Sequence, residues 1–92
     1  MRFTNNLRLR FVLPYEGVVL HKSGEFESTM FPEGCGIVAN VIENKAIQTW
    51  DLELVGDSEF AQDGDRIEVP MFLLYIHKDD IRRVSLEIAA SN

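Results

Sequence analysis

Residues 49–54 read Thr-Trp-Asp-Leu-Glu-Leu, and this stretch decides the fold class. Trp50, Leu52 and Leu54 alternate with polar residues, so every second side chain is apolar. Successive side chains of a β-strand point to opposite faces, so this alternation predicts a strand with one buried face and one exposed face. We expect Trp50 to lie in the core beside the two leucines rather than to bind a ligand.

The same period of two recurs along most of the chain. Leu7, Leu9, Phe11 and Leu13 predict a first strand that ends at Pro14. Similar patterns predict further strands at residues 17–21, 37–42, 46–55, 66–69 and 84–88. Residues 71–76 are apolar at every position, which indicates either a central buried strand or an interface strand. Residues 79–83 suit one short helical turn.

Two segments interrupt this pattern. Residues 25–36 contain Pro32, Gly34 and Gly36, which forbid a regular helix, and we expect an irregular stretch there. Residues 56–65 form an acidic loop that we expect to be exposed, closed by an Asp-Gly pair at 63–64. At 92 residues the chain has room for one core. We therefore expect a single mostly β domain over residues 1–92, a small barrel of five to seven antiparallel strands with one short helical turn before the last strand.

The order of three segments carries a resemblance to a known family. Residues 34–38 place a glycine turn before a strand, residues 49–54 form the amphipathic strand, and residues 75–84 run from apolar side chains into an Asp-Ile-x-x-Val turn. This order resembles the SH3-like barrels of small bacterial domains, over roughly residues 17–88. The resemblance implies an SH3-like barrel, while the acidic loop and the long segment before Gly34 depart from the shortest versions.

Charge narrows the classes of partner. The formal net charge is −6 and the sequence pI is near 4.7, a sign that opposes binding to a phosphate backbone. Arg2, Arg8 and Arg10 lie early in the chain, whereas acids gather between Glu25 and Asp65. We therefore expect a protein partner with a basic surface and no direct nucleic-acid contact. The open alternative is that the negative charge only keeps the protein soluble.

The cysteine count and the apolar segments indicate where the protein is located and whether it needs a cofactor. Cys35 is the sole cysteine, so the chain can form neither an internal disulfide nor a zinc site with several cysteines. The first residues lack the continuous apolar centre of a signal peptide, and no stretch is long enough to cross a bilayer. We expect a cytoplasmic protein that contacts no membrane and needs no cofactor.

The residues with catalytic chemistry do not form a known motif. Cys35 could act as a nucleophile with His21 or His77, but a lone cysteine between glycines is more often a packing residue. His77, Asp79 and Asp80 are the densest local set of metal-ligating types, without a known ligand spacing. The acids of residues 57–65 do not fit the calcium-loop pattern. We therefore expect neither a catalytic nor a metal site, and no enzyme.

Residues 25–33 carry the most informative pattern for binding, because Phe and Met alternate there with acids. Exposed, these side chains would anchor a partner while the acids face a basic rim. The alternative is that Phe26 and Phe31 fold back and plug an open end of the barrel. The predicted partner-binding residues are Glu25, Phe26, Glu27, Met30, Phe31, Asp57, Glu59, Asp63 and Asp65.

Self-association has a separate candidate surface. The second apolar face of residues 71–76 would carry Phe72, Leu74 and Ile76, which predicts a homodimer through that strand. The leading functional hypothesis is a non-enzymatic acidic protein-binding module, of the kind found among immunity proteins and phage-encoded inhibitors. The alternative is an accessory subunit of a nucleoprotein assembly, which would depend on Arg2, Arg8 and Arg10.

Overall fold

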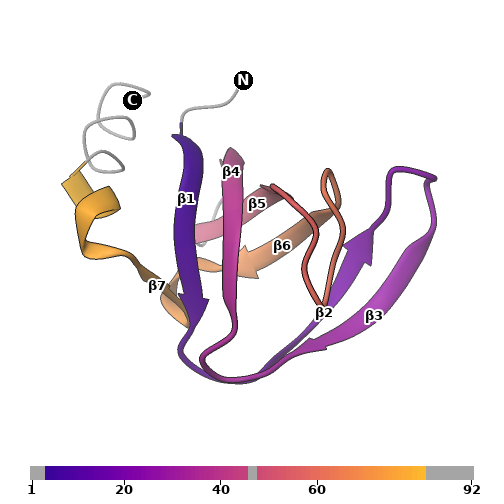
Figure 1. Cartoon of the computed structure of the whole chain (residues 1–92), viewed down its shortest axis with the longest axis horizontal. Coiled ribbons are helices and arrows are strands. Elements are labelled where there is room, and N and C mark those ends of the chain that lie inside the picture. Colours follow the sequence, from indigo (N-terminus) through magenta and orange to yellow (C-terminus); the bar gives the residue numbers. More distant parts are fainter. Residues whose placement is uncertain (1–3, 46–47, 83–92) are drawn as a thin grey trace.

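A single antiparallel sheet makes up most of the computed structural model, which describes residues 4–45 and 48–82. Its seven strands lie in the order β3-β2-β6-β5-β4-β1-β7 (Figure 1). The prediction of a mostly β fold is therefore confirmed. The strands are β1 (Thr4–Phe11), β2 (Tyr15–Leu20), β3 (Phe26–Phe31), β4 (Gly36–Lys45), β5 (Thr49–Leu54), β6 (Arg66–Pro70) and β7 (Leu74–Ile76).

The sheet is open, so the prediction of a closed barrel is not met. Within the described residues, β3 and β7 are its two ends. The β2–β3 hairpin projects on the side away from β7 (Figure 1). Among the described residues, β2 pairs with β6 at one position only, Leu20 with Arg66. Because β2 then diverges from β6, the hairpin does not curl back to complete a barrel.

The core lies on the face that the period of two predicts. Trp50 and Leu52 are fully buried and Leu54 nearly so, which confirms the expectation for β5. Burial of each such side chain contributes about 1.5–3 kcal/mol. Leu13 is exposed, contrary to its predicted place in the first strand, because β1 ends at Phe11. The other core residues are Leu7, Leu9, Phe11, Val19, Phe31, Ile37, Ala39, Val41, Ala61, Ile67, Val69 and Leu74.

Residues 71–76 differ from the single strand that the sequence predicts. Met71–Leu73 form a 3-10 helix, η2, and only Leu74–Ile76 continue as β7, paired with β1. The carbonyl of Leu73 accepts a hydrogen bond from the Val12 N–H at 2.9 Å, which fixes this turn against the end of β1.

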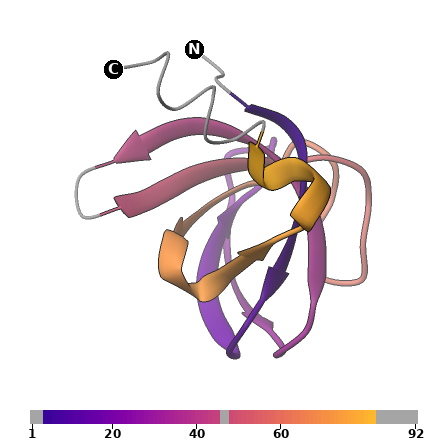
Figure 2. The same cartoon turned by 90° about the vertical axis from the view of Figure 1, so that its left-hand side faces the viewer.

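A short helix follows β7, and its Asp80 side chain is hydrogen-bonded to β1. Residues 78–82 are helical, in line with the predicted turn at 79–83, whereas Arg83 and the strand predicted at 84–88 lie outside the described residues. Figure 2 shows η2 and this helix in front of the sheet. Asp80 accepts hydrogen bonds from the backbone N–H of Arg8 and from its guanidinium, all at 3.0–3.1 Å. Among the described helical residues, none belongs to a helix long and apolar enough to cross a membrane.

Candidate functional site

The β2–β3 hairpin presents an apolar face to the outside of the molecule. Val18, Phe26 and Met30 have 59%, 71% and 51% of their surface exposed, although all three lie on strands. The register pairs Leu20 with Phe26, and the partly buried Leu20 extends the patch. We call Val18, Leu20, Phe26 and Met30 the outer hairpin face. Apolar side chains gathered on one surface are typical of interaction sites, unlike single exposed ones.

This geometry corrects the prediction of an irregular segment at residues 25–36. Residues 26–31 form β3, with Phe26 and Met30 on the outer side and Glu27 and Phe31 on the inner side. The apolar residues on both sides of the strand conceal its period of two. Phe31 is fully buried and stacks on Phe11, with ring centroids 4.9 Å apart. Of the two phenylalanines, therefore, Phe31 packs in the core and Phe26 is exposed to solvent.

A groove of about 530 Å³ runs beside the outer hairpin face, where β2 diverges from β6. Tyr15 spans it, because its hydroxyl donates a hydrogen bond to the Glu68 carbonyl at 2.9 Å. Gly17 lies in the wall, and a Cβ there would lie 2.8 Å from both Ile67 Cδ1 and Tyr15 Cε2, so a larger residue would displace these side chains. The lining residues are Tyr15, Glu16, Gly17, Val18, Leu20, Phe26, Asp51, Arg66, Ile67 and Glu68.

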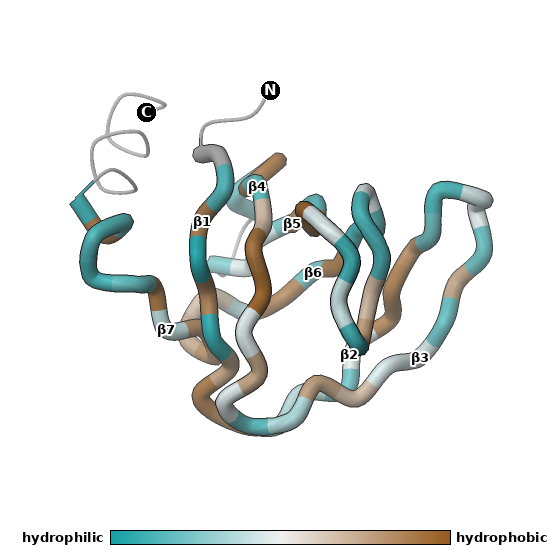
Figure 3. Tube along the Cα trace, viewed as in Figure 1, coloured by the Kyte–Doolittle hydropathy of each residue, from teal (hydrophilic) through white to brown (hydrophobic). Residues whose placement is uncertain are grey.

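The polar residues of the groove leave it with an acidic balance. Arg66 pairs with Asp51 at 3.0 Å, and Glu68 is held by Lys45 from β4. Glu16 has no ion pair among the described residues, and its carboxylate is exposed at the rim. Figure 3 shows that the tip of the β2–β3 hairpin is also hydrophilic. A basic side chain of a partner would therefore find a carboxylate beside the apolar patch.

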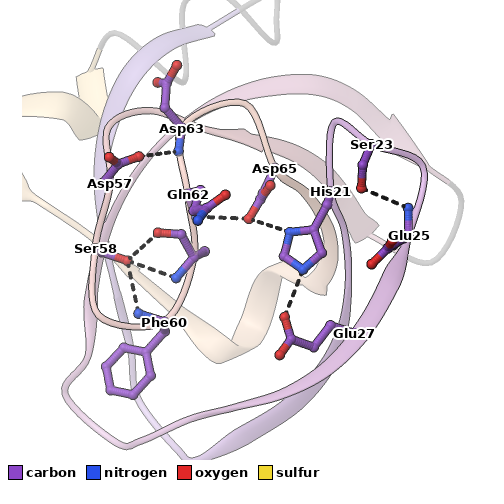
Figure 4. A network of polar contacts seen from close by, with 11 residues as sticks. His21, Ser23, Glu25, Glu27, Asp57, Ser58, Phe60, Gln62, Asp63 and Asp65 are labelled. Atoms are coloured by element: carbon purple, nitrogen blue, oxygen red, sulfur yellow. Dashed lines mark hydrogen bonds and ion pairs between the residues drawn. The ribbon is translucent and has the colours of Figure 1, made fainter.

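His21, at the end of β2, holds three segments together (Figure 4). Its Nδ1 lies 3.0 Å from Asp65 Oδ2 and its Nε2 lies 2.8 Å from Glu27 Oε1. The buried Asp65 also accepts the backbone N–H of Gln62 at 2.8 Å. Hydrogen bonds that the His21 ring donates to the carboxylates of Glu27 and then Asp65 raise the pKa of His21 above its usual value. When His21 is protonated, both ring nitrogens donate, and the imidazolium bridges the hairpin and the acidic loop.

This bridge predicts how stability depends on pH. The folded-state pKa of His21 is raised, so its contribution is fully present below the unfolded pKa of about 6.5 and is lost as pH rises through the folded pKa. We expect His21→Gln to lower the urea midpoint more at pH 6 than at pH 8.5, relative to the unmodified chain. An equal difference at both pH values would show that the imidazolium does not form the bridge.

The acidic loop is organised by its own carboxylates, which bears on four predicted partner-binding residues. Asp57 accepts the backbone N–H of Asp63 at 2.9 Å, and Asp63 accepts that of Gly56 at 2.7 Å. Asp65 is 1% exposed, contrary to its expected place in an exposed loop. Glu59 is exposed and is left available to a partner. Glu25 is likewise exposed at the tip of the hairpin, whereas exposed Glu27 is occupied by His21.

The structure does not bring the candidate catalytic residues together, and of the candidate metal-binding residues it pairs His77 with Asp79, with Nδ1 3.7 Å from Oδ2. The Cys35 side chain packs against the core, and its thiol makes one weak hydrogen bond, to the Gly36 carbonyl at 3.8 Å, and none to His21 or His77 among the described contacts. Burial, and then Glu59, raise the pKa of the Cys35 thiol, which disfavours the nucleophilic thiolate. Asp80 faces Arg8, and the described residues contain no group of three or more possible metal ligands.

The outer hairpin face and the groove form one continuous candidate site, because Val18, Leu20 and Phe26 belong to both. Comparisons with protein-family models, curated proteins and solved structures found no significant match. The chemistry of the site is therefore the guide to its function.

The remaining predicted binding residues lie elsewhere. Phe72 is 79% exposed on η2, Leu74 is in the core, and Ile76 packs against the core, so the predicted self-association residues do not share one face. Arg8 is paired with Asp80, and Arg10 lies over the Tyr75 ring at 4.7 Å. Arg2 lies outside the described residues.

Sequence reasoning missed part of the site. Val18, Leu20 and Arg66 line the groove, and His21 forms the bridge to the acidic loop. A signal for the first two exists, since residues 18–20 are apolar at three successive positions and a half-buried strand needs only every second one. Nothing local marks the contact of His21 with Asp65 or that of Arg66 with Asp51, because these partners are 44 and 15 residues apart in the chain.

Proposed function

We propose that this chain is a non-enzymatic protein-binding module that docks a partner on the outer hairpin face and the adjoining groove. The observation that carries this proposal is the exposure of Val18, Phe26 and Met30 together on two paired strands. Aromatic and methionine side chains are enriched at the centres of protein interfaces, where a few of them supply most of the binding energy. Phe26, the most exposed of the three, is the principal anchor.

The proposed partner has a basic rim around an apolar contact. The chain carries a net charge of −6, and Glu16, Asp51 and Glu68 line the groove against the single guanidinium of Arg66. Since Asp51 and Glu68 already have cationic partners, Glu16 is the carboxylate that faces the rim directly. Such complementarity accelerates association and selects among partners, and salt weakens it.

Immunity proteins and phage-encoded inhibitors are the class of protein that this module fits. They share small size, negative charge and action by covering a surface of another protein. We place the module in the cytoplasm and regard the open sheet as an SH3-like one. The SH3-like reading is supported by β6 running through a 3-10 turn into β7, which returns to pair with β1.

The test is affinity capture with matched surface variants. Tagged protein is incubated with lysate of its native host after nuclease treatment, at low and high salt, and bound proteins are identified by mass spectrometry. We expect one dominant partner, with capture reduced at least about tenfold by Phe26→Ser and weakened by high salt. Phe72→Ser is the control, because Phe72 is equally exposed but lies on η2.

Two outcomes contradict the proposal. Equal capture by the Phe26→Ser and Phe72→Ser variants would show that the outer hairpin face does not bind the partner. Capture only in the presence of nucleic acid would favour a subunit of a nucleoprotein assembly.

A further inference from the structure

The free edge of β3 is the longest unprotected edge in the described sheet. β3 has six residues, and none of the described strands pairs with its outer edge, whereas β7 at the opposite end has only three. Proteins usually block such an edge with Pro, Lys or an inward-pointing charge. The sequence of β3, Phe-Glu-Ser-Thr-Met-Phe, has no Pro or Lys, and its one inward charge, the carboxylate of Glu27, is already paired with His21 of the same hairpin.

The backbone of this edge is oriented to accept another strand. At the hairpin turn, the His21 N–H donates to the Glu25 carbonyl at 2.9 Å, so this pair is a hydrogen-bonded one. In an antiparallel ladder hydrogen-bonded and non-hydrogen-bonded pairs alternate. Phe26, Ser28 and Met30 therefore form the non-hydrogen-bonded pairs with β2. Their N–H and C=O groups point to the free edge.

We propose that a second copy of this chain pairs antiparallel with β3 along that edge, with Ser28 opposite Ser28 of its copy. In this register Phe26 lies opposite Met30 of the copy, and Met30 opposite its Phe26. All three pairs are hydrogen-bonded ones, each exchanging two backbone bonds. The inference does not depend on the proposed partner, because the backbone groups that form the pairing lie on the edge of the strand.

Side chains select this register over its neighbours. Each Phe26 directly faces a Met30 on the outer side, a cross-strand contact between a ring and a thioether, and both side chains are exposed in the single chain. Shifting the copy so that Glu27 faces Glu27 would oppose like charges and leave only two hydrogen-bonded pairs. Placing Thr29 opposite Thr29 of the copy also leaves only two hydrogen-bonded pairs. The two-fold at Ser28 is therefore the register with the most bonds and no charge conflict.

The dimer would join two hairpins into one continuous sheet. The outer hairpin faces of the two copies would then lie side by side and remain open to a partner on the same surface. This arrangement relocates self-association from Phe72, Leu74 and Ile76 to the other end of the sheet.

Sedimentation equilibrium of the full chain tests the proposal. We expect the mass to rise with concentration from 10.5 kDa toward twice that value. Salt should strengthen the association, because it screens repulsion between two chains of net charge −6. This is the opposite of the salt effect expected for the partner, so failure of one proposal is distinguishable from failure of the other.

A comparison of two lysine variants on the same face of the hairpin tests whether the dimer forms through the edge of β3. Ser28→Lys places two ammonium groups opposite each other at the two-fold, and we expect dimer affinity to fall at least tenfold. Val18→Lys is the matched control, because Val18 pairs with Ser28 on the same face but belongs to β2. It should leave the dimer in place.

A cross-link tests the register without relying on affinity. In a Cys35→Ala background, Ser28→Cys should form an intermolecular disulfide under mild oxidation, since facing Cα atoms of a hydrogen-bonded pair are about 5.5 Å apart. Val18→Cys should not. A chain that stays at 10.5 kDa at all concentrations, or equal behaviour of the variants at positions 28 and 18, overturns the proposal.

Discussion

Phe31→Ala is expected to lower the free energy of unfolding by about 3–5 kcal/mol. The Phe31 side chain is fully buried, stacks on Phe11 at 4.9 Å and lies 6.1 Å from the Phe60 ring, all distances between ring centroids. Removing it deletes apolar contacts and leaves a cavity where the hairpin meets the core. Urea denaturation followed by tryptophan fluorescence measures the loss, since Trp50 lies in the same core.

Phe26→Ala is the matched control for this experiment. The residue type and the strand are the same, but Phe26 is on the exposed side of β3. Its substitution should change the free energy of unfolding by no more than about 0.5 kcal/mol. If the two variants lost similar stability, the two sides of β3 would not differ as the structure has them.

Asp65→Ala is expected to have the next largest effect, a loss of about 1–3 kcal/mol. Asp65 is buried and accepts hydrogen bonds from the Gln62 N–H at 2.8 Å and from His21 Nδ1 at 3.0 Å. Without the carboxylate, both donors lose this partner, and the acidic loop loses its buried hydrogen bond to His21 of the hairpin. Thermal or urea unfolding at pH 6 measures the difference.

Glu59→Ala is the control that separates the loss of the buried Asp65 hydrogen bonds from the effect of removing one negative charge on stability. Glu59 belongs to the same loop and carries the same charge, but its side chain is exposed. We expect its free energy of unfolding to stay within about 0.5 kcal/mol of the parent value. A loss equal to that of Asp65→Ala would mean that net charge, rather than the buried hydrogen bonds, determines the stability of the loop.

The strands with one apolar face were predictable from the sequence. β5 and most of β1 alternate cleanly, and the residues that the pattern assigns to the core there are buried. β3 was not predictable in this way because both of its sides carry apolar residues. The prediction of one strand at residues 71–76 was wrong for a different reason. An apolar run has no period, so it does not distinguish a buried strand from a 3-10 turn followed by a short strand.

The site was predictable only in part. Phe26 and Met30 are exposed, as one of the two alternatives for residues 25–33 requires, whereas Phe31 is buried, as the other requires. The groove could not be foreseen, because it exists where β2 leaves β6, and that divergence depends on pairing between distant segments. Asp65 looks like one more acid of an exposed loop until His21 and Gln62 are placed around it.

The position of β1 between β4 and β7 also determines how the chain reaches its fold. The hairpins β2–β3 and β4–β5 join neighbouring segments and need only short loops to close. By contrast, Arg8 meets Asp80 across 72 residues, so the entropy of closing nearly the whole chain must be overcome before that contact forms. Topologies dominated by such distant pairings fold in milliseconds to seconds, not microseconds. Until β7 docks, β1 has an unpaired edge, and this interval is when the newly made chain is most exposed to aggregation.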